Sequence, residues 1–248
     1  MCILIVLRGF HPDYPLVVAG NRDERIDRLA SPPGLWVGER RAVLSPRDRR
    51  AGGTWLAVDE RLAFAGITNL AGVPPVPEAP SRGHLVHLVL DQPDLDAGVD
   101  EVRRRVAADP YSGFQLVVGD RSRLLVLRHA RGVLRVSEWT EPVLVVTNEH
   151  EPGQLVPRGL SLATAPVLAL DQRLAALTTI LRDRGGDGQH AICKRGDGYG
   201  TVSSSLLAIP DGDPLQLLWR YAPGPPDVTD YRNYGNLGRR LLPDPDAG

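Results

Sequence analysis

The stretch MCILIVLRGFHPDYPLVVAGNRDE, residues 1–24, decides the fold. Its two apolar runs, residues 2–7 and 15–19, flank a turn that contains Pro12 and Asp13. This pattern is typical of a β-hairpin inside a buried sheet. Antiparallel pairing brings the end of the second run beside the start of the first. We therefore expect the polar residues 21–24 to lie next to Cys2.

The rest of the chain alternates apolar runs of strand length with helical patterns. Further strands are expected at residues 54–58, 62–68, 114–118, 124–129, 133–136, 143–147, 201–209 and 215–221. Helices are expected over residues 81–91, 99–106 and 168–184, with Ser81 as the N-cap of the first. Strands, then helices, then strands predict an α+β fold, and a four-layer αββα sandwich of antiparallel sheets would accommodate it. We expect one domain over residues 1–222 and a Pro- and Gly-rich tail over residues 223–248.

Composition narrows the class of protein. The chain has 248 residues with a formal net charge of −1, so no global field points to a nucleic-acid partner. Two cysteines, Cys2 and Cys193, cannot build a disulfide framework. Arg8 interrupts the first apolar run, so we expect no signal peptide, and no stretch has the length of a transmembrane segment. These features predict a soluble, cytoplasmic protein.

Cys2 carries the most specific chemistry. Removal of the initiator methionine is expected before a small side chain, and it would give Cys2 a thiol and a free α-amine. With a reference pKa of about 7.7 to 8.0, that amine can act as a base near neutral pH. A nucleophile with its own base is the arrangement of N-terminal nucleophile hydrolases. The alternative is that Cys2 is a small apolar residue that opens a strand.

Three of the five asparagines, Asn21, Asn69 and Asn148, each follow an apolar strand. Strand ends can aim polar groups at a site, although asparagine is also a common turn residue. Beside Cys2, Arg22 would stabilise a thiolate and Asp23 would hold the protonated α-amine. The alternative is that residues 21–24 form an ordinary exposed loop.

Several other motifs are incomplete. The glycines of residues 52–53 and 198–200 open strands and form no G-x-G-x-x-G unit, so a dinucleotide site is not supported. His84 and His87 lack a third metal ligand, which favours a surface helix. No G-x-S-x-G elbow is present. We expect no required metal or cofactor.

Seven short motifs occur in an order that resembles the NRDE family, which includes transport and Golgi organisation protein 2. They are Met1-Cys2, Asn21-Arg22-Asp23-Glu24, Gly52-Gly53-Thr54-Trp55, Gly66-Ile67-Thr68-Asn69, Ser81-Arg82-Gly83, Gly113-Phe114-Gln115-Leu116 and Gly200-Thr201. The resemblance covers residues 1 to about 221. It implies a fold similar to N-terminal nucleophile hydrolases, particularly the choloylglycine hydrolase group.

The resemblance to that group implies roles for five residues. Cys2 would attack an amide, Arg22 and Asp23 would support it, and Asn69 and Asn148 would help bind the oxyanion. The sequence also departs from the resembling proteins. Val202 follows Gly200-Thr201 where they tend to carry an arginine, and residues 149–153 replace a Pro-Trp segment.

Two functions remain open from the sequence. The first is a cysteine amidohydrolase that acts on non-peptide carbon–nitrogen bonds of a small molecule. The second, implied by links of the resembling family to haem and lipids, is a non-catalytic carrier of haem or an acyl lipid. Without a C-x-x-C-H motif, haem would be bound non-covalently. Nothing in the sequence argues for a purely structural protein.

Overall fold

The computed structural model describes residues 2–186 and 190–242, and its contacts divide the chain into two compact units. The first unit comprises Met1–Arg28, Glu141–Asp211 and Leu218–Tyr234. The second comprises Leu29–Thr140, Gly212–Leu217 and Gly235–Gly248. Each unit contains one antiparallel sheet, so the predicted α+β class with two antiparallel sheets is confirmed.

The sheet of the first unit has six strands in the order β10-β1-β2-β11-β12-β13. They are β1 (Ile3–Arg8), β2 (Leu16–Arg25), β10 (Val143–Thr147), β11 (Tyr199–Ile209), β12 (Leu218–Ala222) and β13 (Arg232–Asn233). Strands β1 and β2 pair antiparallel from Ile3↔Asn21 to Arg8↔Leu16, as the hairpin pattern predicted. Strand β1 therefore lies inside the sheet, with β2 on one side and the edge strand β10 on the other.

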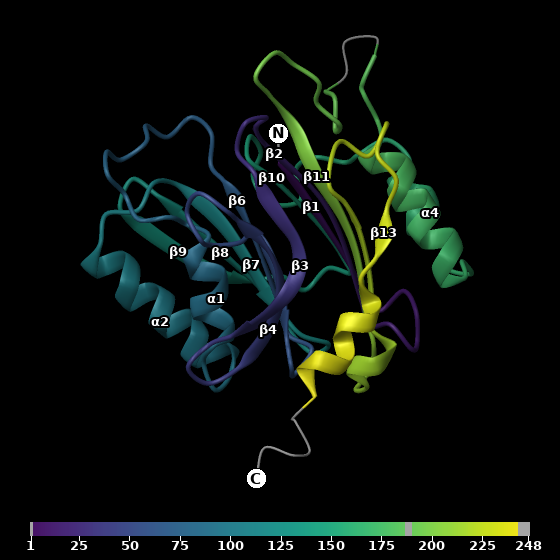
Figure 1. Ribbon diagram of the computed structural model, residues 1–248, viewed down its shortest axis with the longest axis horizontal. Coiled ribbons are helices and arrows are strands. Elements are labelled where there is room, and N and C mark those ends of the chain that lie inside the picture. Colours follow the sequence, from purple (N-terminus) through teal and green to yellow (C-terminus); the bar gives the residue numbers. More distant parts are fainter. Residues whose placement is uncertain (1, 187–189, 243–248) are drawn as a thin grey trace. The chain divides into compact units, whose positions relative to one another are not determined.

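One face of this sheet packs against helix α4 (Leu170–Leu181), as Figure 1 shows. Alternate residues of β1 supply the contact because successive side chains of a strand point to opposite faces. Ile3, Ile5 and Leu7 share a core with Leu174 and Leu177 of the helix. The short helix α3 (Leu160–Ala163) adds to the same core. The apolar stripe at helical spacing therefore positions α4 on the sheet.

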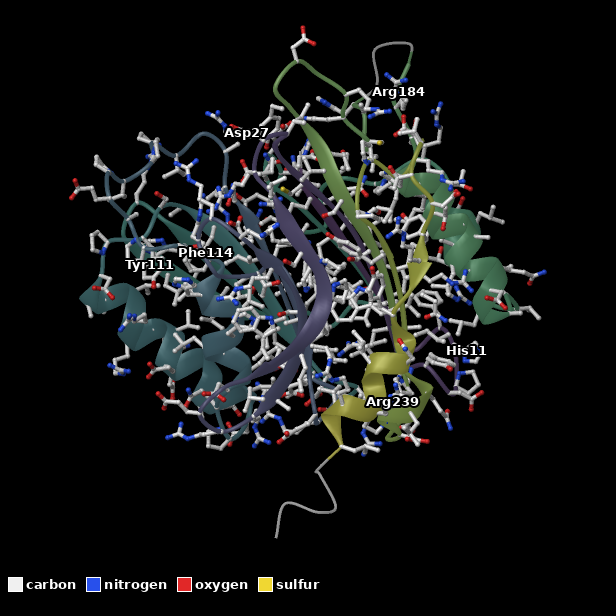
Figure 2. All side chains as sticks on the ribbon, viewed as in Figure 1. His11, Asp27, Tyr111, Phe114, Arg184 and Arg239 are labelled. Atoms are coloured by element: carbon white, nitrogen blue, oxygen red, sulfur yellow. The ribbon has the colours of Figure 1, made fainter. Side chains whose placement is uncertain are left out.

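The second unit holds a seven-stranded sheet in the order β3-β4-β5-β6-β7-β8-β9. Its strands are β3 (Ala30–Val37), β4 (Ala42–Asp48), β5 (Leu56–Asp59), β6 (Phe64–Asn69), β7 (Phe114–Gly119), β8 (Leu124–Ala130) and β9 (Val133–Glu138). Helices α1 (His84–Leu90) and α2 (Leu95–Ala108) share a core with this sheet. Tyr111 and Phe114, labelled in Figure 2, meet edge-on in that core at a centroid distance of 6.4 Å. The 3₁₀ segments η1 (Pro214–Gln216) and η2 (Gly235–Leu241) complete the described elements.

Three local expectations differ from the structure. The sequence pattern missed β3 and β4, whose prolines and arginines hide the alternation of a strand. Ser81 does not cap α1, because the N-cap is Gly83 and it makes no side-chain bond. Residues 21–24 belong to β2 and are not a loop. Polar residues continue a strand here because β11 pairs with them up to Tyr199↔Arg25.

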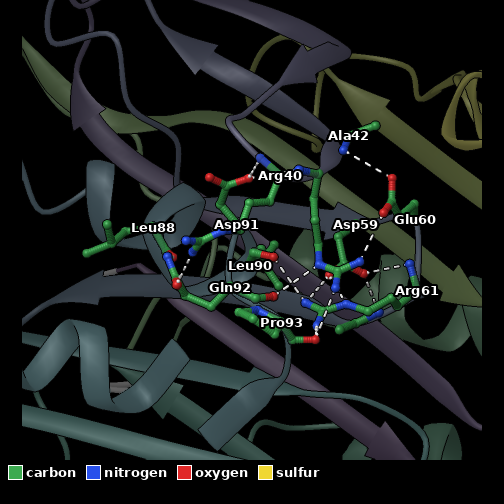
Figure 3. A network of polar contacts seen from close by, with 12 residues as sticks. Arg40, Ala42, Asp59, Glu60, Arg61, Leu88, Leu90, Asp91, Gln92 and Pro93 are labelled. Atoms are coloured by element: carbon green, nitrogen blue, oxygen red, sulfur yellow. Dashed lines mark hydrogen bonds and ion pairs between the residues drawn. The ribbon is translucent and has the colours of Figure 1, made fainter. Parts of the chain in front are cut away.

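An arginine network ties the β5–β6 turn to the end of α1 (Figure 3). Asp59 is fully buried, and its carboxylate accepts from the Arg61 guanidinium at 2.5 and 2.8 Å. Arg61 also donates to the main-chain oxygens of Leu90, at 3.0 Å, and Pro93. A buried carboxylate needs such partners, because unpaired it would be costly to desolvate.

His87 predicts an acid-dependent loss of stability in the second unit. Burial, with His84 and Arg47 nearby, lowers its pKa from 6.5 to about 4, and its Nε2 lies 3.0 Å from Ser45 Oγ. Between these two pH values the unfolded chain binds more protons than the folded chain. The contribution of His87 to the free energy of unfolding should therefore be fully present above pH 6.5. The free energy of unfolding should fall by about 3 kcal/mol as the pH drops to 4.

Urea unfolding of the wild type and of His87→Gln between pH 4 and 7.5 checks this expectation. The variant should show a flatter pH dependence, because glutamine can keep a bond to Ser45 without titrating. The exposed His190 supplies the matched control, and His190→Gln should retain the wild-type slope. Parallel curves for the wild type and His87→Gln would contradict the role of His87.

Candidate active site

Cys2 lies at the open beginning of β1. Ile3, the first residue of that strand, pairs with Asn21 of β2 and with Thr147 of β10. One further step along both ladders places Cys2 beside Arg22 on one side and Asn148 on the other. This extension of the strand register supports the predicted convergence of the three residues, which stays a prediction.

The sulfur of Cys2 faces the main chain of Asp23. Its Sγ donates to the Asp23 oxygen at 3.4 Å and accepts from the Asp23 nitrogen at 3.4 Å. The residue is half-buried. Dense packing around the sulfur, and then the negative charge of Asp23, raise the pKa of the Cys2 thiol to about 11, against smaller lowering effects that include Arg22. The thiol therefore needs a nearby base to become a nucleophile near neutral pH.

The carboxylate of Asp23 is held by β11. Thr201 pairs with Asp23 in the ladder, and its Oγ1 donates to Asp23 Oδ1 at 2.7 Å. The same Oγ1 accepts from the main-chain nitrogen of Lys194 at 2.9 Å, so its orientation is fixed. Asp23 is 2% exposed, and burial raises the pKa of its carboxyl, although Thr201 and Lys194 oppose the shift.

Arg22 brings a buried positive charge to the strand beside Cys2. It is 6% exposed, and its Nη2 lies 3.9 Å from Oε2 of Glu24. Arg28 binds the same oxygen of Glu24 at 3.0 Å. The charge of Arg22 lowers the pKa of the Cys2 thiol, but burial and the charge of Asp23 outweigh this effect.

Asn148 follows β10 in a turn that its neighbours hold in place. Thr147 Oγ1 accepts from the main-chain nitrogen of His150 at 3.1 Å and lies 2.9 Å from the ring Nδ1 of the same residue. The Oδ1 of Asn148 is buried and receives no hydrogen bond from the described residues. Buried polar atoms are usually paired, so a bound molecule could complete this one.

The other two asparagines have different surroundings. Asn21 donates to the main-chain oxygens of Leu181, at 2.9 Å, and Ile192, at 3.1 Å. The hydrogen bond to Leu181 links β2 to the end of α4. Asn69 ends β6 in the second unit, where it is exposed. Its oxyanion role stays a prediction.

Val202 marks an irregularity in β11. The register of β11 against β2 shifts between Thr201 and Ser203, so Val202 is the extra residue of a β-bulge. It lines a pocket of about 510 Å³ in the first unit. The pocket combines apolar and basic groups and is lined by Ile26, Lys194, Arg195, Gly196, Asp197, Gly200, Thr201, Val202, Pro223, Gly224 and Pro225. Thr201, which also binds Asp23, links the pocket to the cysteine site, although Cys2, Arg22, Asp23 and Asn148 do not line it.

Sequence reasoning missed two residues at this site. In the sequence, Thr201 belongs to a short Gly-Thr motif, and Tyr199 lies between two glycines. The Oη of Tyr199 donates to the main-chain oxygen of Asp23 at 3.2 Å. A strand that follows a glycine-rich segment could have suggested close approach, but it does not name the partner.

The second cysteine has different surroundings. Cys193 is 1% exposed, and its Sγ lies 3.2 Å from Oδ1 of Asp227. Burial, and then Asp227, raise the pKa of this thiol to about 11. Among residues 2–186 and 190–242, no cluster of three or more His, Cys, Asp and Glu side chains could hold a metal ion. No helix in the same ranges is both long and apolar enough to cross a membrane.

Two antiparallel sheets of this topology place the chain in the class of proteins with the N-terminal nucleophile hydrolase fold. A variant of conjugated bile acid hydrolase from Clostridium perfringens matches with a TM-score of 0.51 and 12% identity, over 94% of this chain and 96% of that one. An N-acylethanolamine-hydrolyzing acid amidase orthologue from Caenorhabditis elegans matches with a TM-score of 0.52 and 11% identity, over 84% and 92%. At such identities the likeness shows the fold alone.

The family follows from the sequence. A model of the family Transport and Golgi organisation 2 matches residues 1–216, and the chain belongs to this family. The mouse homologue is 32% identical over 112 residues, which are 44% of this chain and 40% of the homologue. The human homologue is 24% identical over 229 residues, or 79% and 82%. The segment matched to the mouse protein thus spans less than half of that relative.

Proposed function

We propose that this protein is a cysteine N-terminal nucleophile hydrolase that cleaves carbon–nitrogen bonds other than peptide bonds in small amides. The observation that carries the proposal is the position of the Cys2 sulfur, 3.4 Å from both main-chain polar atoms of Asp23 at the open start of β1. Arg22 of β2 and Asn148, directly after β10, come one residue after the partners of Ile3. The bile acid hydrolase and acid amidase of the same fold support the reaction class.

Removal of Met1 turns the nitrogen of Cys2 into an α-amine. This amine takes the thiol proton, a step that matters because burial holds the pKa of the thiol at about 11. Asp23, oriented by Thr201, holds the resulting ammonium group. Arg22 offsets the negative charge of the sulfur. The nucleophile is thereby activated by residues of the first unit.

The thiolate attacks the amide carbonyl carbon, and the carbonyl π electrons move to oxygen. Asn148 donates a hydrogen bond to this oxyanion, and loss of one such donor costs roughly 3 to 4 kcal/mol of transition-state stabilisation. The ammonium returns its proton to the leaving amine as the carbon–nitrogen bond breaks. Water, deprotonated by the same amine, then cleaves the thioester, releases the carboxylic acid and restores the thiol.

The pocket beside Thr201 suits the apolar part of such a substrate. Its volume of about 510 Å³ lies in the range of small-molecule sites, and Ile26, Val202, Pro223 and Pro225 contribute apolar walls. Thr201, which lines this pocket, also binds Asp23 next to the Cys2 sulfur. This assignment favours acyl amides over small polar amides.

Intact mass spectrometry tests the proposal directly. Purified protein should lack Met1, and incubation with a panel of acyl amides should add the mass of the acyl group to Cys2. Retention of Met1 would remove the proposed base. Absence of both an acyl-enzyme and released amine across the panel would overturn the hydrolase proposal.

A carrier function is the second candidate, and the apolar walls of the same pocket favour it. A carrier would bind an acyl lipid or haem without turnover. Binding of either ligand, followed by fluorescence or by the haem absorption band, should then survive Cys2→Ala. Turnover that depends on Cys2 would instead favour the hydrolase.

A further inference from the structure

The hydroxyl group of Tyr199 and the thiol of Cys2 converge on one acceptor. Tyr199, the first residue of β11, donates to the main-chain oxygen of Asp23 at 3.2 Å. The Sγ of Cys2 donates to the same oxygen at 3.4 Å. Two donors from different strands therefore share a single carbonyl group, and this sharing brings the phenol into the surroundings of the sulfur.

Ionisation of Cys2 changes this arrangement. The sulfur loses the proton that it gives to Asp23, and a negative charge then lies 3.4 Å from a carbonyl oxygen. Such a contact is unfavourable unless donors face the sulfur. The Asp23 nitrogen, at 3.4 Å, is one donor. Rotation of the Tyr199 hydroxyl about its Cζ–Oη bond would redirect a second proton toward the sulfur.

We propose that Tyr199 is a positioning residue for the nucleophile: its hydroxyl binds Asp23 while Cys2 is a thiol and turns to the sulfur when Cys2 is a thiolate. The proposal deepens the proposed function, since it concerns the same sulfur. It adds a donor from β11 to the Asp23 nitrogen of β2, which already donates to the sulfur.

The charges around the phenol keep it a donor. Burial, and then the negative charges of Cys2, Asp23 and Glu24, raise the pKa of Tyr199 above its ordinary value of 10, so the hydroxyl is protonated across the neutral range. Arg22 opposes this shift but does not reverse it. The carboxylates of Asp23 and Glu24 cannot donate when ionised. The charge of Lys194, from the loop before β11, opposes the rise in the pKa of Asp23.

The test measures the rate of Cys2 alkylation by iodoacetamide as a function of pH in the wild type and in Tyr199→Phe. Loss of one hydrogen bond to a charged sulfur should lower the rate at pH 8 roughly tenfold and raise the apparent pKa by about 1. Peptide mapping assigns the label to Cys2. Thermal unfolding should be nearly unchanged, since Tyr199 is 43% exposed.

Tyr231→Phe is the matched control. Tyr231 belongs to the same unit, and its hydroxyl binds Ser204 Oγ of β11 at 2.6 Å. Its removal should leave the alkylation profile of Cys2 unchanged. An unaltered profile in Tyr199→Phe would overturn the proposal. Faster alkylation in Tyr199→Phe would overturn it as well, because the ring would then only shield the sulfur.

The outcome is separable from that of the proposed function. A shifted alkylation profile without turnover of any acyl amide would retain the role of Tyr199 and reject the hydrolase. Turnover that is equal in the wild type and Tyr199→Phe, with equal profiles, would retain the hydrolase and reject Tyr199. If both hold, Tyr199→Phe should lower kcat and leave KM nearly unchanged.

Discussion

Replacement of Cys2 by alanine is expected to abolish the proposed amide hydrolysis, with kcat falling at least about a thousandfold. The expectation follows from chemistry, because no acyl-enzyme can form without the sulfur. The fold should survive, since the substitution removes one atom at a half-buried position and should cost about 1 kcal/mol. Amine release from acyl amides measures the first effect, and urea unfolding measures the second. Cys2→Ser should retain a trace of activity at most, since a hydroxyl is the poorer nucleophile.

Cys193→Ala provides the control for that experiment. Cys193 is buried and hydrogen-bonded to Asp227. The variant should keep the wild-type kcat, and in the wild type Cys2 should alkylate far faster than Cys193. Activity that persists in Cys2→Ala would reject the cysteine mechanism. Equal alkylation of the two thiols would show that Cys2 is not activated.

Replacement of Arg173 by methionine is expected to cost about 3 to 5 kcal/mol of the free energy of unfolding. Arg173 lies in α4, is 0% exposed, and donates to the main-chain oxygens of Phe10 at 3.0 Å, Ala165 at 3.2 Å and Ala163. Its guanidinium also lies 5.1 Å from the ring centroid of Phe10. Methionine keeps much of the packing but leaves these carbonyl groups buried without a donor, which is costly.

Urea denaturation at neutral pH, followed by far-UV circular dichroism, measures this loss. Arg158→Met is the matched control, because Arg158 pairs with Asp183 at 2.9 Å while its side chain is 62% exposed. Its replacement should change the stability by less than about 1 kcal/mol, as for other exposed ion pairs. Similar losses in the two variants would show that the buried bonds of Arg173 contribute little.

The different burial of the two arginines could not be predicted from the sequence. The stripe of Leu170, Leu174, Leu177 and Leu181 predicted the helix around Arg173, because helical periodicity depends only on spacing along the chain. Nothing in that spacing distinguishes Arg173 from an exposed arginine. Its burial depends on the carbonyl group of Phe10, which is far away in the sequence.

The α+β class, the first hairpin and the family motifs could all be predicted from the sequence. These features depend on local alternation, turn residues and motif order, all of which can be read along the chain. The hairpin register even places Cys2 beside Arg22, because an antiparallel turn aligns the two strands.

The hydrogen-bond partners of the polar residues near Cys2 are known only from the tertiary structure. It assigned Asn21 to the end of α4, joined Asp23 to Thr201, and brought the hydroxyl of Tyr199 to the oxygen that Cys2 also contacts. These contacts span about 160 to 180 residues of sequence separation. They depend on which strands become neighbours and on the bulge at Val202. Local periodicity predicts neither of these features. The physical reason is that hydrogen-bond partners are chosen by position in the assembled sheet and not by distance along the chain.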